Sequence, residues 1–172
     1  MNSTAAIYSL ARPASAVSAE AQQVRDRATQ MVERAEASTV LFGKKMGAID
    51  MLESLSRSHA KPGWDGEEAL PVNLSAINLA ADFLRALPDG VDMPEVGVEP
   101  DGAVTLDWLP SRHRMLSISF SGNGDRLAYA WLDGFDRGNG VVRFNRQVIP
   151  RQLLEAIETT TEATRYVGIR VA

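Results

Sequence analysis

Carboxylates are the side chains in this sequence whose spacing comes nearest to a reaction site. Asp65, Glu67 and Glu68 lie together, while Asp101 and Asp107 flank a predicted strand. A glycosidase needs two carboxylates at a set separation, and a hard cation needs several converging oxygen atoms. The positions of these acids in the sequence fix neither geometry, and solvated acids at turns and helix starts explain them more simply. A carboxylate-dependent hydrolase centred on Asp65, Asp101 and Asp107 therefore stays an alternative hypothesis.

Other reactive groups are sparse. The chain has no cysteine, which excludes disulfides, thiolate metal sites and cysteine nucleophiles. Neither of its two histidines, His59 and His113, has a partner at the spacing of metal ligands. Glycine-rich runs at 121–124 and 134–140 do not join a strand to a helix with the spacing of a phosphate-binding loop. We therefore predict no catalytic residue, no metal site and no cofactor.

The distribution of charge bears on the choice of partner. The chain of 172 residues has a net charge of −4. Residues 62–109 hold ten acidic residues and one basic residue, and residues 110–151 hold seven basic and three acidic residues. These blocks compensate each other across the fold, or the acidic block meets a basic partner protein. Arginines near Tyr129, Trp131 and Phe144 could stack nucleic-acid bases, but a pI near 5.2 argues against a nucleic-acid-binding protein.

Composition and hydropathy predict the broad class and location. An apolar share of 45% and a charged share of 23% are typical of a globular protein with its own core. No apolar run approaches the roughly 20 residues of a membrane span. The absence of cysteine fits a reducing compartment. We expect a cytoplasmic protein that does not contact a membrane.

The first part of the chain predicts a helical arm. We expect residues 1–15 to be disordered and residues 16–61 to form the arm. Its apolar side chains recur at three- and four-residue spacing, at Val24, Ala28, Met31, Val32 and Ala35, then at Met46, Ile49, Leu52 and Leu55. Gly43 lies between the two sets, so the arm is either two helices or one long bent helix. Such a helix must pack against the remaining chain, a second copy or a partner.

Residues 62–172 predict an α+β domain. A helix at 73–87, capped by Asn73 or Ser75, has a wide apolar face. From Pro94 the hydrophobic period changes to two, which indicates about five strands joined by short turns and therefore an antiparallel meander. The expected strands lie near 96–98, 104–108, 115–120 and 127–131, with Pro110 ending the second. After a glycine-rich connection that starts at Asp133, a last strand is expected at 141–144. A helix at 151–160 follows, and the two helices cover one face of the sheet.

The stretch GWDGEEALP, residues 63–71, predicts a structured turn between the arm and the domain. Gly63 and Gly66 permit backbone angles that other residues resist. Asp65 is placed to accept bonds from nearby amides. Trp64 is predicted to pack under the helix at 73–87, and the alternative is an exposed interface anchor.

This turn and the following hairpin carry a resemblance. The series GWDGEEALPVNLSAINLAADFLRALP, followed by MPEVGVEPDGAVTLDW, resembles a family of small, largely uncharacterised bacterial proteins. They share a W-D-G-x-x-A-x-P turn, a helix ending in Leu-Pro and a P-D-G-x-[VI]-x-L-x-W hairpin. The matching residues are Trp64, Asp65, Gly66, Ala69, Pro71, Leu87, Pro88, Pro100, Asp101, Gly102, Leu106 and Trp108. The match covers about residues 50 to 145 and leaves out the first 45. It implies an accessory partner of another gene's product, such as an antitoxin or immunity protein.

The leading hypothesis is therefore a non-enzymatic protein-binding module, antitoxin- or immunity-like, that neutralises or scaffolds a partner protein encoded nearby. The candidate partner-binding residues are Met31, Val32, Leu41, Phe42, Asp65, Glu67 and Glu68. The hydrolase is one alternative. A self-associating structural protein, which forms a homo-oligomer through residues 18–57, is the other.

Overall fold

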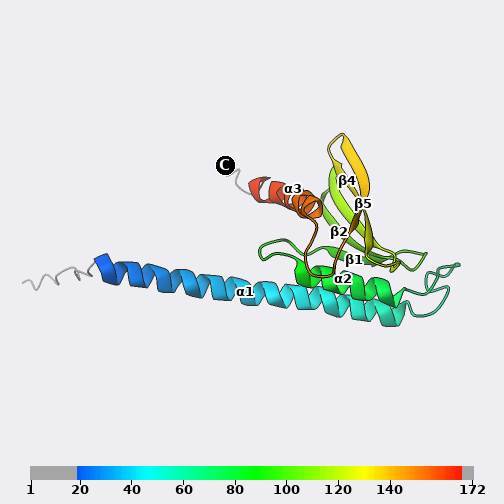
Figure 1. The fold of residues 1–172 in the computed structure, drawn as a ribbon, viewed down its shortest axis with the longest axis horizontal. Helices are drawn as coiled ribbons and strands as arrows, with labels where there is room; N and C mark the ends of the chain where they lie inside the picture. Colours follow the sequence, from blue (N-terminus) through cyan, green and yellow to red (C-terminus); the bar gives the residue numbers. More distant parts are fainter. Residues whose placement is uncertain (1–18, 168–172) are drawn as a thin grey trace, which may run out of the picture. The chain divides into compact units, whose positions relative to one another are not determined.

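A computed structural model describes the backbone of residues 19–167 and the side chains of residues 22–32 and 42–161. The described chain holds three helices and a five-stranded antiparallel sheet (Figure 1), which is the predicted α+β class. The chain divides into two compact units, residues 1–38 and residues 39–172. The segment that we expected to be disordered, residues 1–15, lies outside the described residues.

The first helix, α1, runs continuously over Ala19–Ser58. The two-helix alternative is thus wrong, because Gly43 stays inside the helix. A glycine in an exposed helix costs about 1 kcal/mol relative to alanine, which is too little to break hydrogen bonding that continues on both sides. The division between the units falls after Ser38, and residues 39–58 belong to the same unit as the sheet. The predicted arm ends later in the sequence, at residue 61.

The last turns of α1 take part in the core of the second unit. Ile49 and Leu52 are buried there. The Lys45 ammonium donates a hydrogen bond to the carbonyl oxygen of Leu87. It also forms an ion pair with Asp89 at 3.5 Å. These contacts tie the end of α1 to the segment that follows the second helix.

The second helix, α2, spans Leu74–Ala86 and confirms the sequence prediction. Asn73 is its N-cap, and the Asn73 side chain accepts the Ser75 amide at 2.8 Å. Leu87 closes the other end, where its amide donates to the carbonyl oxygens of Phe83 and Leu84. Its buried face consists of Ala76, Ile77, Leu79, Ala80, Ala81, Phe83 and Leu84.

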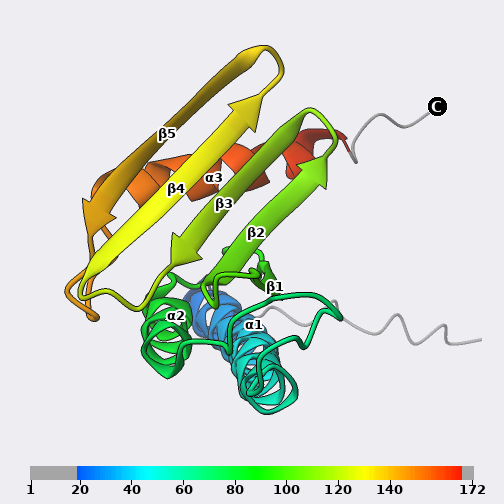
Figure 2. The ribbon, with the colours of Figure 1, turned by 90° about the vertical axis from the view of Figure 1, so that its right-hand side faces the viewer.

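The sheet is a meander in which each strand pairs with the next. Its strands are β1 (Glu95–Val98), β2 (Val104–Ser111), β3 (Arg114–Phe120), β4 (Arg126–Asp133) and β5 (Asp136–Arg143). Both α2 and the last helix, α3 (Arg151–Val167), contact β2 and β3. Figure 2 shows α3 behind the sheet, with the other face of the sheet toward the viewer. The predicted covering of one face by these two helices is confirmed, and α3 continues past residue 160.

Strand β2 continues through Pro110, which we expected to end it. The pairing register between β2 and β3 shifts between Trp108 and Ser111. Proline has no amide hydrogen to donate, and strands accept it at such irregularities. The strand therefore passes Pro110 by giving up regular pairing at that position.

Strand β5 begins at Asp136, so the predicted long connection from Asp133 is wrong. A short turn containing Gly134 replaces it, and Gly138 and Gly140 lie inside the strand. They pair with Trp131 and Tyr129 on β4. A Cβ atom on Gly138 would lie 2.8 Å from the Trp131 ring, and one on Gly140 would lie 2.8 Å from the Tyr129 ring. The rings occupy the space that side chains would take, which makes glycine suitable here.

Phe83 lies at the centre of the core. Its ring makes edge contacts with Phe120 at 5.5 Å and with Phe144 at 5.3 Å between centroids. All three side chains are fully buried. One aromatic side chain thus joins α2 to β3 and to the segment after β5.

Replacing Phe83 with alanine should cost about 3 to 5 kcal/mol of unfolding free energy, because two aromatic contacts are lost and a cavity remains. Urea denaturation measures this loss. Phe135→Ala is the matched control, since Phe135 is fully exposed at the β4–β5 turn and should change stability by less than about 0.5 kcal/mol. Similar effects of the two substitutions would contradict a core centred on Phe83.

Candidate functional site

The turn at residues 63–71 is closed by its own hydrogen bonds. The Asp65 carboxylate accepts the amides of Glu67 at 2.9 Å and Ala69 at 3.3 Å. The Gly63 amide donates to the Ala69 carbonyl at 2.8 Å. Gly63 and Gly66 have φ angles of 72° and 86°, in the left-handed region that favours glycine. The carboxylate of Asp65 thus shapes the turn.

Trp64 does not pack under the helix at 73–87, and that prediction is wrong. Its ring lies edge-on to the His59 ring at 4.2 Å, at the end of α1. Its indole N–H donates to the Leu70 carbonyl at 2.9 Å. The half-buried ring is outside the hydrophobic cluster that holds the buried face of α2. The indole N–H needs an acceptor, and the acceptor at Leu70 holds the ring against α1.

Backbone hydrogen bonds join this turn to the β1–β2 hairpin. The Leu70 amide donates to the Pro100 carbonyl at 2.7 Å, and the Asn73 amide donates to the Gly102 carbonyl at 2.9 Å. Gly102 has a φ of 82°, and a Cβ atom there would lie 2.5 Å from the Pro71 carbonyl oxygen. The two halves of the resemblance, the W-D-G turn and the P-D-G hairpin, therefore lie side by side.

The three acids of the alternative hydrolase site make different contacts. The Asp101 carboxylate accepts the Ala103 amide at 2.9 Å. Partial burial of its carboxyl group raises the pKa of Glu99, and the nearby charges of Asp101 and Asp107 raise it further. Asp101 and Asp107 are both near enough to affect the charge of Glu99, while Asp65 bonds its own turn. The residues with described side chains include no cluster of three or more histidines or acids fit to hold a metal ion.

Sequence reasoning missed Glu99. Its position in the sequence could have pointed to it, because Glu99 follows β1 directly and precedes Asp101 by two residues. Strand alternation places the Glu99 side chain on the same face of the sheet as Glu95 and Gly97. A Cβ atom on Gly97 would lie 2.7 Å from the Thr105 hydroxyl and 3.9 Å from the Asp107 carboxylate.

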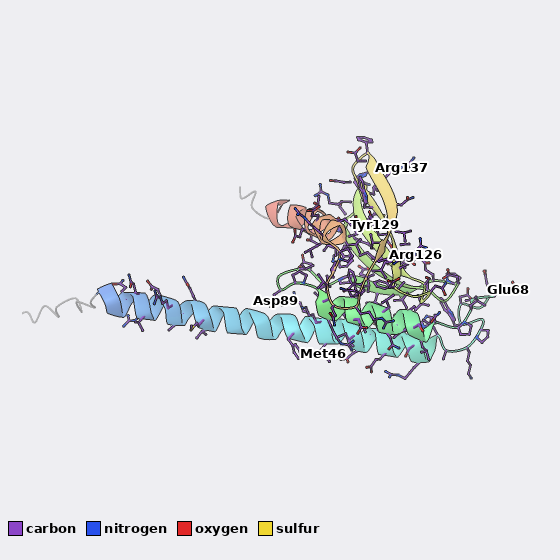
Figure 3. The ribbon with its side chains drawn as sticks, in the orientation of Figure 1. Met46, Glu68, Asp89, Arg126, Tyr129 and Arg137 are labelled. Carbon is purple, nitrogen blue, oxygen red and sulfur yellow. The ribbon has the colours of Figure 1, made fainter. Side chains whose placement is uncertain are left out.

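The candidate partner-binding residues lie at the surface where they are described. Met31 and Val32 are 72% and 56% exposed in the first unit, and Phe42 is 66% exposed in the second. The side chain of Leu41 lies outside the described residues. Asp65, Glu67 and Glu68 are exposed in the turn, and Figure 3 shows Glu68 at its outer end. On α1, the prediction omitted three other exposed apolar residues, Val24, Met46 and Met51.

A cavity of about 340 Å³ lies between α3 and the β4–β5 hairpin. Arg114 lines it and forms an ion pair with Asp133 at 2.8 Å. Glu155 also lines it and accepts a bond from Arg151, and the Thr160 hydroxyl donates to a carbonyl of its own helix. These polar groups already bond their neighbours, so they are poorly placed to orient a ligand in the cavity.

Comparison with family models, curated proteins and solved structures yields no significant match. None of the described helices is both long enough and apolar enough to pass through a bilayer.

Replacing Gly102 with alanine should destabilise the domain more than the same change at Gly124. Both residues have φ near 80°, so both substitutions carry the cost of a left-handed alanine, about 1 to 2 kcal/mol. Only Gly102 would press a Cβ atom against a backbone oxygen, since nothing lies within 4 Å at Gly124. We expect an extra loss of at least about 1 kcal/mol in urea denaturation. Equal losses of unfolding free energy in the two variants would show that the close approach of Gly102 to Pro71 does not restrict the side chain at position 102.

The raised pKa of Glu99 predicts a pH-dependent stability. The unfolded chain releases this proton at lower pH than the folded chain does, so stability falls as pH rises through the folded pKa. Glu99→Gln should therefore melt at a higher temperature than the parent at neutral pH, and the difference should vanish in acid, where the parent carboxyl is protonated. Glu68→Gln, in the exposed turn, controls for net charge. Identical pH profiles of melting temperature for the two variants would refute the interpretation.

Proposed function

We propose that this chain is a non-enzymatic protein-binding module, antitoxin- or immunity-like, that binds a partner protein through the first part of α1. One observation carries the proposal. Every side chain described between residues 22 and 32 is exposed, and the apolar ones are Val24, Ala28, Met31 and Val32. We call these four residues the arm surface.

The spacing of the arm surface supports helix binding. Val24, Ala28 and Met31 recur at four and three residues, so they share one face of the helix, and Val32 borders it. A single amphipathic helix gains most of its stability from packing. Helices of this kind bind hydrophobic grooves through anchors at these spacings. The arm surface thus offers a partner an apolar stripe in helical form.

Charge supports a basic partner. Residues 62–109 carry a net charge of −9, from ten acidic residues and one basic residue. In the exposed turn, Glu67 and Glu68 face solvent. Opposite charge on a partner would increase the association rate and orient the encounter. A basic protein with an apolar groove therefore fits both features.

The experiment is co-purification of the full chain with the products of the adjacent genes, followed by calorimetry on any complex. The variant Met31→Lys/Val32→Lys should weaken binding at least about tenfold, because two apolar anchors are replaced by charges. The matched control is Gln23→Lys/Gln30→Lys, which adds the same charge on another face of the same exposed helix and should bind as the parent does.

Two results would contradict the proposal. The first is that the chain purifies without a partner and that deleting it does not change the toxicity of the neighbouring gene products. The second is that the arm variants lose self-association but still bind the partner. That result would favour the alternative of a structural protein that associates through residues 18–57.

A further inference from the structure

The face of the sheet turned away from α2 and α3, which we call the open face, has small side chains at its centre. Strand alternation places Ser117, Ser119, Ala128 and Ala130 there, on β3 and β4. Two shallow hollows of about 410 and 510 Å³ lie along these residues. Figure 2 shows this face toward the viewer, with no helix in front of it. Within the second unit, neither α2 nor α3 covers the open face.

Charge on the open face is separated from one side to the other. Glu95, Glu99 and Asp107 lie on or directly after β1 and β2, and we call them the acidic rim. Arg126, Arg137 and Arg143 lie on β4 and β5, and we call them the basic rim. Figure 3 shows Arg126 and Arg137 on the side of the sheet away from α3.

Each rim concentrates charge of one sign. Arg126 and Arg143 are direct cross-strand partners, and like charges in that position repel. Burial together with Asp101 and Asp107 raises the pKa of Glu99. Within the described part of the chain, the arginines of the basic rim form no ion pair. Each rim would therefore be stabilised by opposite charge from outside the chain.

We infer that the open face binds the open face of a second copy, with the basic rim of each copy over the acidic rim of the other. A two-fold axis along the strands produces this arrangement, because it reverses the strand order and places β5 of one copy over β1 and β2 of its partner. An axis across the strands would place like charges together. The interface is self-complementary in charge only in the first orientation.

The centre of the open face suits close approach. Stacked sheets lie about 10 Å apart, and serine and alanine side chains leave room for that spacing. Met115 and Val141, 36% and 55% exposed, add apolar contact. Five strands of about seven residues cover roughly 500 Å² in projection. That footprint is smaller than the roughly 800 Å² per partner of a standard interface, so the dimer is weak and reversible.

The surface used here is separate from the arm surface, so the inference does not rest on the proposed function. It is tested with the full chain by sedimentation equilibrium over a series of concentrations at low and high salt. We expect a monomer–dimer equilibrium whose dissociation constant increases with salt, because the rims are exposed to screening. A monomer at every concentration would overturn the inference.

Charge reversal identifies the surface. Arg143→Glu and Glu99→Arg should each raise the dissociation constant at least about tenfold, because the two-fold axis along the strands places Arg143 of one copy over the level of Glu99 of the other, and each change puts like charges together twice. Mixing the two variants should restore dimers, and so should combining both changes in one chain. Arg57→Glu, which makes the same change in the last turn of α1, is the control and should dimerise as the parent does. Failure of both restorations, or a dimer broken by Met31→Lys/Val32→Lys instead, would refute this interface.

Discussion

The arrangement of the second unit depends on the short segment that enters α2. Asn73 makes four hydrogen bonds there: its side-chain oxygen accepts the Ser75 amide, its carbonyl accepts the Ile77 amide, its backbone amide donates to the Gly102 carbonyl, and its side-chain amide donates to the Ser121 carbonyl at 3.2 Å. One residue thus fixes the start of α2 relative to two hairpin turns that lie far away in the sequence. Both turns place glycine against this segment, since a Cβ atom on Gly122 would meet the Asn73 side chain at 2.7 Å. The close approach is possible only because those positions lack side chains.

Once α2 is fixed, the core and the two faces of the sheet follow. Its buried stripe brings Phe83 between Phe120 and Phe144, and α3 covers the same side of the strands. Strand alternation then sends the polar and small residues to the open face. The residues of the turn and hairpin motifs serve this arrangement, since Asp65 and Asp101 accept amides of their own turns. Asp65 and Asp101 therefore have structural roles in their own turns, while Glu67 and Glu68 of the first turn stay exposed.

The elements with strong local signals could be predicted from the sequence, and those whose signals come from a neighbour could not. Helix α2 has a cap and a wide apolar stripe, and most of the strands alternate clearly. Strand β5 lacks that alternation, because the rings that fill the space beside Gly138 and Gly140 belong to β4. The position of Trp64 depends on the carbonyl of Leu70, which accepts its indole N–H. The pKa of Glu99 depends on Asp101 and Asp107. The spacing of residues in the sequence reveals neither contact.

The order of the strands leaves one long edge without a partner in the described chain. Strand β5 has eight residues and pairs only with β4. Its outer backbone groups form a template for strand addition. Arg137 and Arg143, near its two ends, repel a second strand of the same kind. Addition of a like strand at this edge would bring positive charges together, and salt would weaken that repulsion by screening.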